Sequence, residues 1–255
     1  MPKISKRPRD KTVGKIVAHA LDGQTVHNAI LIDLPPQERE AVCSKAEYVD
    51  LPIHSLLNEM AEPIQQCYFI NSGLASILNV MSDGKSVEVG LTGSEGFVGL
   101  PLVVGFATSP TRALIQIAGS AIRVSAKHLV DILPKCPELE WHLNRYTQEL
   151  ALQSAQIAAC NRLHPVEERL ARWLLMSEDR VGKSTFILTQ EFLAHMLGTR
   201  RASVTIAAGT LQKAGLITYR RGQVKIESRA ELEKVSCECY QAIREQMKSW
   251  SKESH

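Results

Sequence analysis

The stretch of sequence that decides the fold runs from residue 188 to residue 211 and reads LTQEFLAHMLGTRRASVTIAAGTL. Its first half predicts a short helix that Thr189 can cap. Gly198 follows directly, and glycine tolerates the positive φ that a tight turn between helices needs. Its second half predicts another helix, capped by Thr199. The predicted buried residues are Leu193, Met196 and Leu197 in the first helix and Val204, Ala207, Ala208 and Leu211 in the second. The pattern is a helix-turn-helix.

The outward side of the second helix carries the candidate contacts to DNA. A helix that enters the major groove must be slim and must carry donors near its N-terminal end. Arg201 suits a bidentate contact to guanine, the commonest specific contact to a base. The other positions expected at or near base edges are Arg200, Ala202, Ser203 and Ile206. Phosphate or sugar contacts are expected from Thr189, Gln190, Thr199 and Thr205.

Residues 216–226, LITYRRGQVKI, predict a β-hairpin with a basic tip. A hairpin in this place is the wing of a winged helix, and Arg220, Arg221 and Lys225 are expected on backbone phosphates. The alternative is a plain pair of packed helices, which explains neither the paired arginines nor the basic hairpin.

The charge distribution favours the same partner. The net charge of the 255 residues is only +3. Subtracting Asp and Glu from Lys and Arg gives 8 − 14 = −6 over residues 26–160, and 11 − 5 = +6 over residues 161–225. This asymmetry indicates one part that meets a polyanion and one that does not. The expected polyanion is double-stranded DNA.

The preceding region predicts short antiparallel strands. Apolar runs alternate with turn formers at residues 71–73, 82–85 and 119–120. Short helices are expected near residues 36–46 and after Ser125. The predicted fold class is therefore α+β, with an N-terminal antiparallel jelly-roll or barrel, a long helix and a C-terminal winged helix-turn-helix. The expected segments are a basic, disordered tail (1–25), a barrel sensor domain (26–136), a dimerisation helix (137–161), the DNA-binding domain (162–228) and a helical extension (229–255).

The long helix carries a heptad pattern. Its apolar or small positions step alternately by four and three over about three heptads, which is typical of a two-stranded coiled coil. The alternative is a helix that packs on its own domain. The residues expected at a homodimer interface are Leu139, Leu143, Tyr146, Leu150, Gln153, Ile157 and Cys160.

Several classes of protein are disfavoured. No run of 18 apolar residues is present, so no membrane partner is expected. The basic N-terminus lacks an apolar segment typical of a secretory signal, and a cytoplasmic location is expected. Neither a nucleophile elbow nor a P-loop is found, and the histidines are scattered, so an enzyme is disfavoured. The six cysteines are expected to be isolated, reduced thiols, with no metal and no cofactor: Cys43, Cys67, Cys136, Cys160, Cys237 and Cys239.

On these motifs the chain resembles the cyclic-AMP receptor protein / fumarate-nitrate regulator (Crp/Fnr) superfamily. The resemblance spans about residues 26–226. It is strongest at VEERLARWL (166–174), at residues 188–211 and at Gly215-Leu216-Ile217. The resemblance implies a barrel of the cyclic-nucleotide-binding type, a homodimer on an inverted-repeat operator, and RNA polymerase as a partner.

Two departures concern the ligand and the operator. Leu100 stands where the superfamily's ribose-binding glutamate would be, so cyclic AMP is disfavoured; the expected effector pocket comprises Gly99, Leu100, Thr111, Arg112 and Ala113. Ala202 and Ile206 replace two residues that read bases in well-known members, so a different operator is expected. A small-molecule effector therefore stays open. The alternative function is a ligand-binding regulatory protein that reads no specific DNA.

Overall fold

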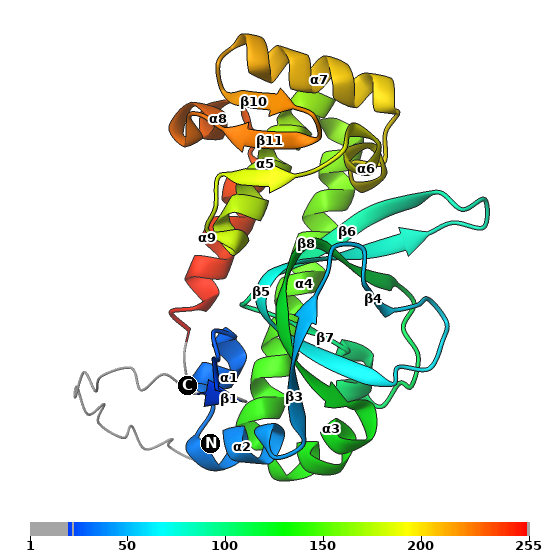
Figure 1. Cartoon of the computed structure of the whole chain (residues 1–255), viewed down its shortest axis with the longest axis vertical. Helices are drawn as coiled ribbons and strands as arrows, with labels where there is room; N and C mark the ends of the chain where they lie inside the picture. Colours follow the sequence, from blue (N-terminus) through cyan, green and yellow to red (C-terminus); the bar gives the residue numbers. More distant parts are fainter. Residues whose placement is uncertain (1–19, 22, 254–255) are drawn as a thin grey trace, which may run out of the picture.

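The computed structural model describes residues 20–21 and 23–253 and shows a strand-rich half and a helical half along one long axis (Figure 1). Most of the predicted disordered tail, residues 1–19 and 22, lies outside the described residues. At the end of that predicted tail, β1 (Ala20–Leu21) pairs with β2 (Gln24–Thr25). In the part of the chain that is described, no helix has the length and apolar character to cross a bilayer.

The strand-rich half is a six-stranded antiparallel sheet in the order β3-β8-β5-β6, with β4 on β8 and β7 on β5. Its strands are β3 (Ala46–Leu51), β4 (Leu56–Asn58), β5 (Gln66–Val80), β6 (Ser86–Thr92), β7 (Phe97–Val98) and β8 (Arg112–Ser125). The helical segments beside them are α1 (Ala29–Asp33), α2 (Pro36–Cys43), η1 (Leu100–Val104), α3 (Ala126–Ile132) and η2 (Leu133–Lys135). The predicted helices α2 and α3 are confirmed, and Ser125 caps α3 by accepting a hydrogen bond from the His128 amide at 3.2 Å.

Two of the predicted turns are wrong, because β5 and β8 run straight through them. Gly73 and Gly119 face each other where these long strands pair. A Cβ atom at Gly119 would lie 2.0 Å from the carbonyl oxygen of Ser72, and one at Gly73 would lie 2.5 Å from that of Ile117. The glycines are therefore needed for close approach of two bulged strands, not for chain reversal. The predicted turn at Gly84 (φ +81°) does join β5 to β6.

The long helix α4 (Pro137–Leu163) carries the residues predicted for the dimer interface. Its heptad residues face the chain's own core: Leu139 and Leu143 are fully buried against the sheet, and the Tyr146 hydroxyl donates to Thr92 Oγ1 at 2.8 Å. Leu150 packs on the cluster beside β5, and Gln153 accepts a hydrogen bond from the Leu91 amide at 3.3 Å. Ile157 and Cys160 are also buried. The chain itself therefore covers most of this heptad pattern, with Leu150 half-buried, and the dimer interface stays a prediction.

The helical half follows α4 and shares a core with the sheet. It comprises α5 (Val166–Val181), β9 (Thr185–Ile187), α6 (Gln190–Met196), α7 (Arg201–Lys213), β10 (Ile217–Arg220), β11 (Gln223–Ile226), α8 (Arg229–Val235) and α9 (Cys239–Trp250). One apolar cluster joins α5, α6, α7 and the hairpin to Leu74 of β5 and Leu91 of β6. The two halves are thus packed together. The predicted fold class, an antiparallel sheet before a C-terminal helix-turn-helix, is confirmed.

The cysteines correct a second expectation. Cys160 at the end of α4 lies against Cys237 and Cys239 at the start of α9, and these three thiols form a buried cluster. They are not isolated, because the break between α8 and α9 returns the chain to the end of α4.

Candidate nucleic-acid interface

The first helix of the helix-turn-helix is α6, and its start is capped as predicted. The Thr189 hydroxyl accepts a hydrogen bond from the Phe192 amide at 3.1 Å. The predicted apolar face is confirmed, since Leu193, Met196 and Leu197 are all buried. The helix therefore presents Thr189 and Gln190 at its exposed N-terminal end.

The turn between the helices contains Gly198 at φ +56°, as predicted. The N-cap of α7, however, is Arg200 and not Thr199. The Thr199 amide still donates to the Ala194 carbonyl at 3.0 Å, whereas the Arg200 carbonyl already accepts from the Val204 amide at 3.2 Å. Thr199 therefore belongs to the turn.

The face of α7 that carries the predicted contacts points outward. Val204, Ala207, Ala208 and Leu211 are buried, as predicted. Arg201, Ala202, Thr205 and Ile206 are exposed, and Ser203 is half-buried. Ile206 is 66% exposed, so this face of α7 also presents an apolar side chain to the solvent. This surface is therefore available to a partner.

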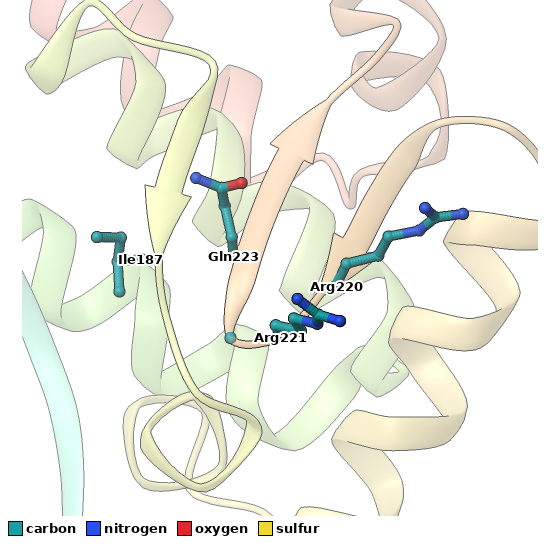
Figure 2. Close-up of a pocket in the computed structure, with 5 residues that line it drawn as sticks. Ile187, Arg220, Arg221 and Gln223 are labelled. Carbon is teal, nitrogen blue, oxygen red and sulfur yellow. The ribbon is translucent and has the colours of Figure 1, made fainter.

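The predicted hairpin is formed by β10 and β11, which reverse at Arg221 (φ 50°) and Gly222 (φ +75°). Positive φ at both central residues is the two-residue turn that suits a twisted hairpin. Figure 2 shows the tip, where Arg220 extends from one side of the hairpin and Gln223 from the other, opposite Ile187 of β9. The turn thus places two arginine side chains at the end of the wing.

The wing tip and the helix-turn-helix enclose one shared hollow of about 380 Å³. Its lining residues are Thr189, Gln190, Arg201, Tyr219, Arg221 and Gly222. The Thr205 hydroxyl donates to Gln190 Oε1 at 2.8 Å, which ties α7 to α6 beside it. The hollow brings together four of the predicted contacts and no carboxylate, so it suits an anion. Sequence reasoning missed Tyr219, whose hydroxyl donates to the Leu188 carbonyl at 2.7 Å.

Two predicted base contacts lie elsewhere. Arg200 and Ser203 line a separate hollow against the β5–β6 hairpin, together with Lys85 and Val87. There the turn of the helix-turn-helix touches the sheet, since a Cβ atom on Gly198 would lie 2.9 Å from Val87 Cγ2. One side of the start of α7 therefore faces the chain's own β6.

Lys225, predicted to contact phosphate, is engaged with a carboxylate. Its ammonium group lies 2.7 Å from Glu227, and that pairing lowers the pKa of the Glu227 carboxyl. Both side chains are solvent-exposed or nearly so, and an ion pair of this kind contributes little to stability. The contact of Lys225 with phosphate stays a prediction.

Comparison with known proteins then assigns this part of the chain. A family model described as the Crp-like helix-turn-helix domain matches residues 168–235. The chain carries a Crp-like helix-turn-helix domain. The match runs from α5 through both helices and the wing to the end of α8, so it includes every element that lines the shared hollow.

Solved structures share the fold of about three quarters of this chain. FixK2 from Bradyrhizobium japonicum is 17% identical, with a TM-score of 0.64 over 75% of this chain and 98% of that one. The c-di-GMP-responsive global regulator CLP from Xanthomonas campestris is 18% identical, with a TM-score of 0.63 over 76% and 100%. A CRP/FNR-family regulator from Thermus thermophilus is 19% identical, with a TM-score of 0.61 over 74% and 98%. A sequence search of the curated proteins found no match.

A buried polar contact joins the Crp-like domain to the sheet. Trp173 of α5 donates from Nε1 to Glu88 Oε1 at 2.9 Å, and the Ser76 hydroxyl lies 2.6 Å from Glu88 Oε2. Glu88 is 2% exposed. Burial raises the pKa of its carboxyl from 4.5 to about 7, although Ser76, Arg172, Trp173 and Arg180 act to lower it.

Outside the Crp-like domain, the predicted effector pocket is not assembled as one group. Arg112 is held by Glu59, with Nη2 2.8 Å from Oε2, and this pair lowers the pKa of Glu59. Gly99 follows β7, which pairs with Tyr68 near the beginning of β5, whereas Arg112 pairs with Leu78 near its end. Leu100 packs on the core beside α4, Ala113 is buried, and Thr111 bonds to Ser109. The pocket stays a prediction, and Arg112 would have to leave Glu59 to bind an anion.

Proposed function

We propose that this chain is a sequence-specific DNA-binding transcription regulator of the Crp/Fnr type. The observation that carries the proposal is the shared hollow of the Crp-like domain, which is lined by Arg201 from the start of α7 and by Arg221 from the wing tip. A recognition helix in the major groove with a basic hairpin on the adjacent backbone needs this arrangement.

In this proposal the exposed face of α7 reads bases. Arg201, at the first turn, donates to guanine O6 and N7. Ala202 and Ile206 lie on the same exposed face and offer only apolar contact, which suits the methyl group of thymine. The phosphate contacts come from residues at the start of α6, in the turn, on α7 and on the wing: Thr189, Gln190, Thr199, Thr205, Arg220, Arg221 and Lys225. Arg200 and Ser203 lie beside β6, and a movement of α7 away from that strand would bring them closer to DNA.

The proposal includes a homodimer, because an inverted-repeat operator needs two readers. With the apolar seam of α4 covered by the rest of the chain, we infer that its opposite face joins the two copies. That face also repeats in steps of three and four, and its exposed residues include Thr147, Ala151, Ala155, Ala158 and Arg162. Small side chains let two helices approach closely. We also propose RNA polymerase as a partner and a small-molecule effector other than cyclic AMP.

The test is selection of randomised duplex DNA by the purified chain at physiological salt, followed by sequencing. We expect enrichment of an inverted repeat with half-sites about 10 base pairs apart, one turn of DNA. Salt must be controlled, because non-specific binding dominates at low salt. Tight binding to DNA without an enriched motif would instead favour the ligand-binding alternative. In that alternative the barrel is the active part and no specific DNA sequence is read.

A further inference from the structure

The end of α4 and the start of α9 bring four metal-ligating side chains to one point. Cys160, His164, Cys237 and Cys239 each offer one ligand atom, and these atoms all lie within 4.8 Å of one another. Cys160 lies in the last turn of α4 and His164 is the C-cap of that helix, whereas Cys237 and Cys239 flank Glu238, the N-cap of α9. All three cysteines are buried, and each is a free thiol.

The spacing of the ligand atoms fits one tetrahedral ion. For metal–sulfur bonds of about 2.3 Å, the sulfurs of a tetrahedron lie about 3.8 Å apart. Here Cys160 Sγ lies 3.4 Å from Cys237 Sγ, and Cys239 Sγ lies 3.5 Å from His164 Nδ1. In an iron–sulfur cluster some of the ligands bind different iron atoms, and those ligands stand further apart than the 4.8 Å within which all four atoms lie here. The arrangement is therefore too compact for a cluster and suits a single ion.

The surroundings supply the groups that orient and balance such a centre. With Nδ1 turned to the sulfurs, His164 Nε2 lies 3.1 Å from the Glu238 carboxylate, the partner that commonly orients a metal-bound histidine. The Gln156 amide donates to Cys239 Sγ at 3.2 Å. Both are in place without any rearrangement of the four ligands.

Two buried cations lie beside the cluster, and a negative charge on the cluster would stabilise them. Arg169 is 6% exposed and Arg172 is 2% exposed, and both act electrostatically on Cys160. Among the described residues neither forms an ion pair with a carboxylate within bonding distance, and the Nε atom of each lacks a hydrogen-bond partner. Arg172 also acts electrostatically on Glu88. Three thiolates, a neutral imidazole and a divalent ion carry a net charge of −1, which these guanidinium groups would offset.

We propose that Cys160, His164, Cys237 and Cys239 form a structural Zn²⁺ site of the Cys₃His type. Closed four-ligand sites of sulfur and nitrogen are those in which zinc is structural, with no open position for catalysis. The ion would tie the junction of α4 and α5 to the C-terminal helices. The assignment is independent of DNA binding.

The experiment is a metal titration of the full chain, reduced and stripped with a chelator. Co²⁺ is the probe, because thiolate ligation in a tetrahedral site gives strong charge-transfer and visible absorption bands. We expect saturation at one Co²⁺ per chain and displacement by one Zn²⁺. Bound Zn²⁺ should protect Cys160, Cys237 and Cys239, but not Cys43, from alkylation mapped by mass spectrometry. These readouts need no variant and do not depend on a variant's folding.

Matched variants then locate the site. Cys237→Ser should abolish the tetrahedral spectrum, whereas Cys43→Ser, a half-buried thiol in α2, should keep it. Glu238→Gln should weaken Zn²⁺ binding ten- to a hundredfold, because it only orients His164. The proposal is overturned if binding does not saturate, if Cys237→Ser leaves the spectrum unchanged, or if iron and sulfide occupy the site. A Cys160–Cys237 disulfide that persists in freshly reduced chain with excess zinc would also overturn it.

Discussion

Glu88 places a carboxyl group inside the protein, between β6 and the Crp-like domain, and its proton has a predictable effect. Its folded-state pKa of about 7 lies above the value of 4.5 for an exposed glutamate. The folded state therefore holds a proton that the unfolded chain releases between these pH values. The stability that this proton contributes is complete below about pH 4.5 and is lost as the pH rises through 7.

Glu88→Gln should remove this dependence, because an amide can donate to Ser76 and accept from Trp173 as the protonated acid does. A shift from 4.5 to about 7 corresponds to roughly 3 kcal/mol at about 1.4 kcal/mol per unit. We expect the variant to gain up to that amount relative to the natural chain between pH 5 and pH 8, by urea denaturation. The matched control is Glu140→Gln, exposed on α4. The prediction would be contradicted if the variant and the natural chain differed in free energy of unfolding by the same amount at pH 5 and at pH 8.

Arg201 is the residue on which sequence-specific reading depends. Arg201→Ala should weaken operator binding by about 1–3 kcal/mol and relax the preference at one base position. The measurement is binding to the selected operator and to a set of single-base variants at fixed salt. Lys248→Ala, an exposed cation on α9, serves as the control. Equal weakening on every sequence would make Arg201 a phosphate contact instead.

At the scale of the element, we expect the wing to strengthen binding to any DNA sequence, whereas Arg201 is expected to select one. Arg221 stands in a two-residue turn whose positive φ angles leave its side chain at the tip, where a phosphate is the available partner. Arg221→Ala should weaken binding to all duplexes about equally and reduce the slope of log K against log salt by about 1. Titrations at several salt concentrations give the slope. A loss confined to one base position would show that the wing reads sequence.

The secondary-structure elements also show which features of the fold can be predicted from sequence patterns. The helix-turn-helix and the wing were predicted to within a few residues, since local signals set them: a capping threonine, a glycine turn and apolar spacing. The bends of β5 and β8 were missed, because Gly73 and Gly119 match the signature of a turn and only the pairing of distant strands shows otherwise. Propensity cannot distinguish a reversal from a close approach.

A related limit applies to the heptad pattern of α4. A heptad pattern identifies a buried seam but not the surface that buries it. In α4 the apolar seam is turned to the chain's own core and the small outward residues are left for another partner. The cysteine cluster was missed because its two halves lie 77 positions apart; a cysteine and a histidine four residues apart at a helix end were the available signal.

At the scale of the whole molecule, the proposed dimer rests on the outward face of α4. Ala151 is exposed at the middle of that face. Ala151→Glu should place like charges opposite each other and convert dimers to monomers, with at least a tenfold weaker dimerisation constant for a cost above about 1.4 kcal/mol. Sedimentation across a concentration series measures it. Ala242→Glu, exposed on α9, is the matched control, and an unchanged constant for Ala151→Glu would reject this face.

The contact between Trp173 and Glu88 has a practical consequence for watching the molecule work. Trp173 is one of three tryptophans and is fully buried, with its indole nitrogen bonded across the boundary between the two halves. Its fluorescence should be emitted at short wavelength while that boundary is closed, and should shift to the red and become accessible to quenchers when the halves separate. Replacing Trp141 and Trp250 with phenylalanine would leave Trp173 as the single tryptophan. The chain thus contains its own optical reporter for the movement of α7 away from β6.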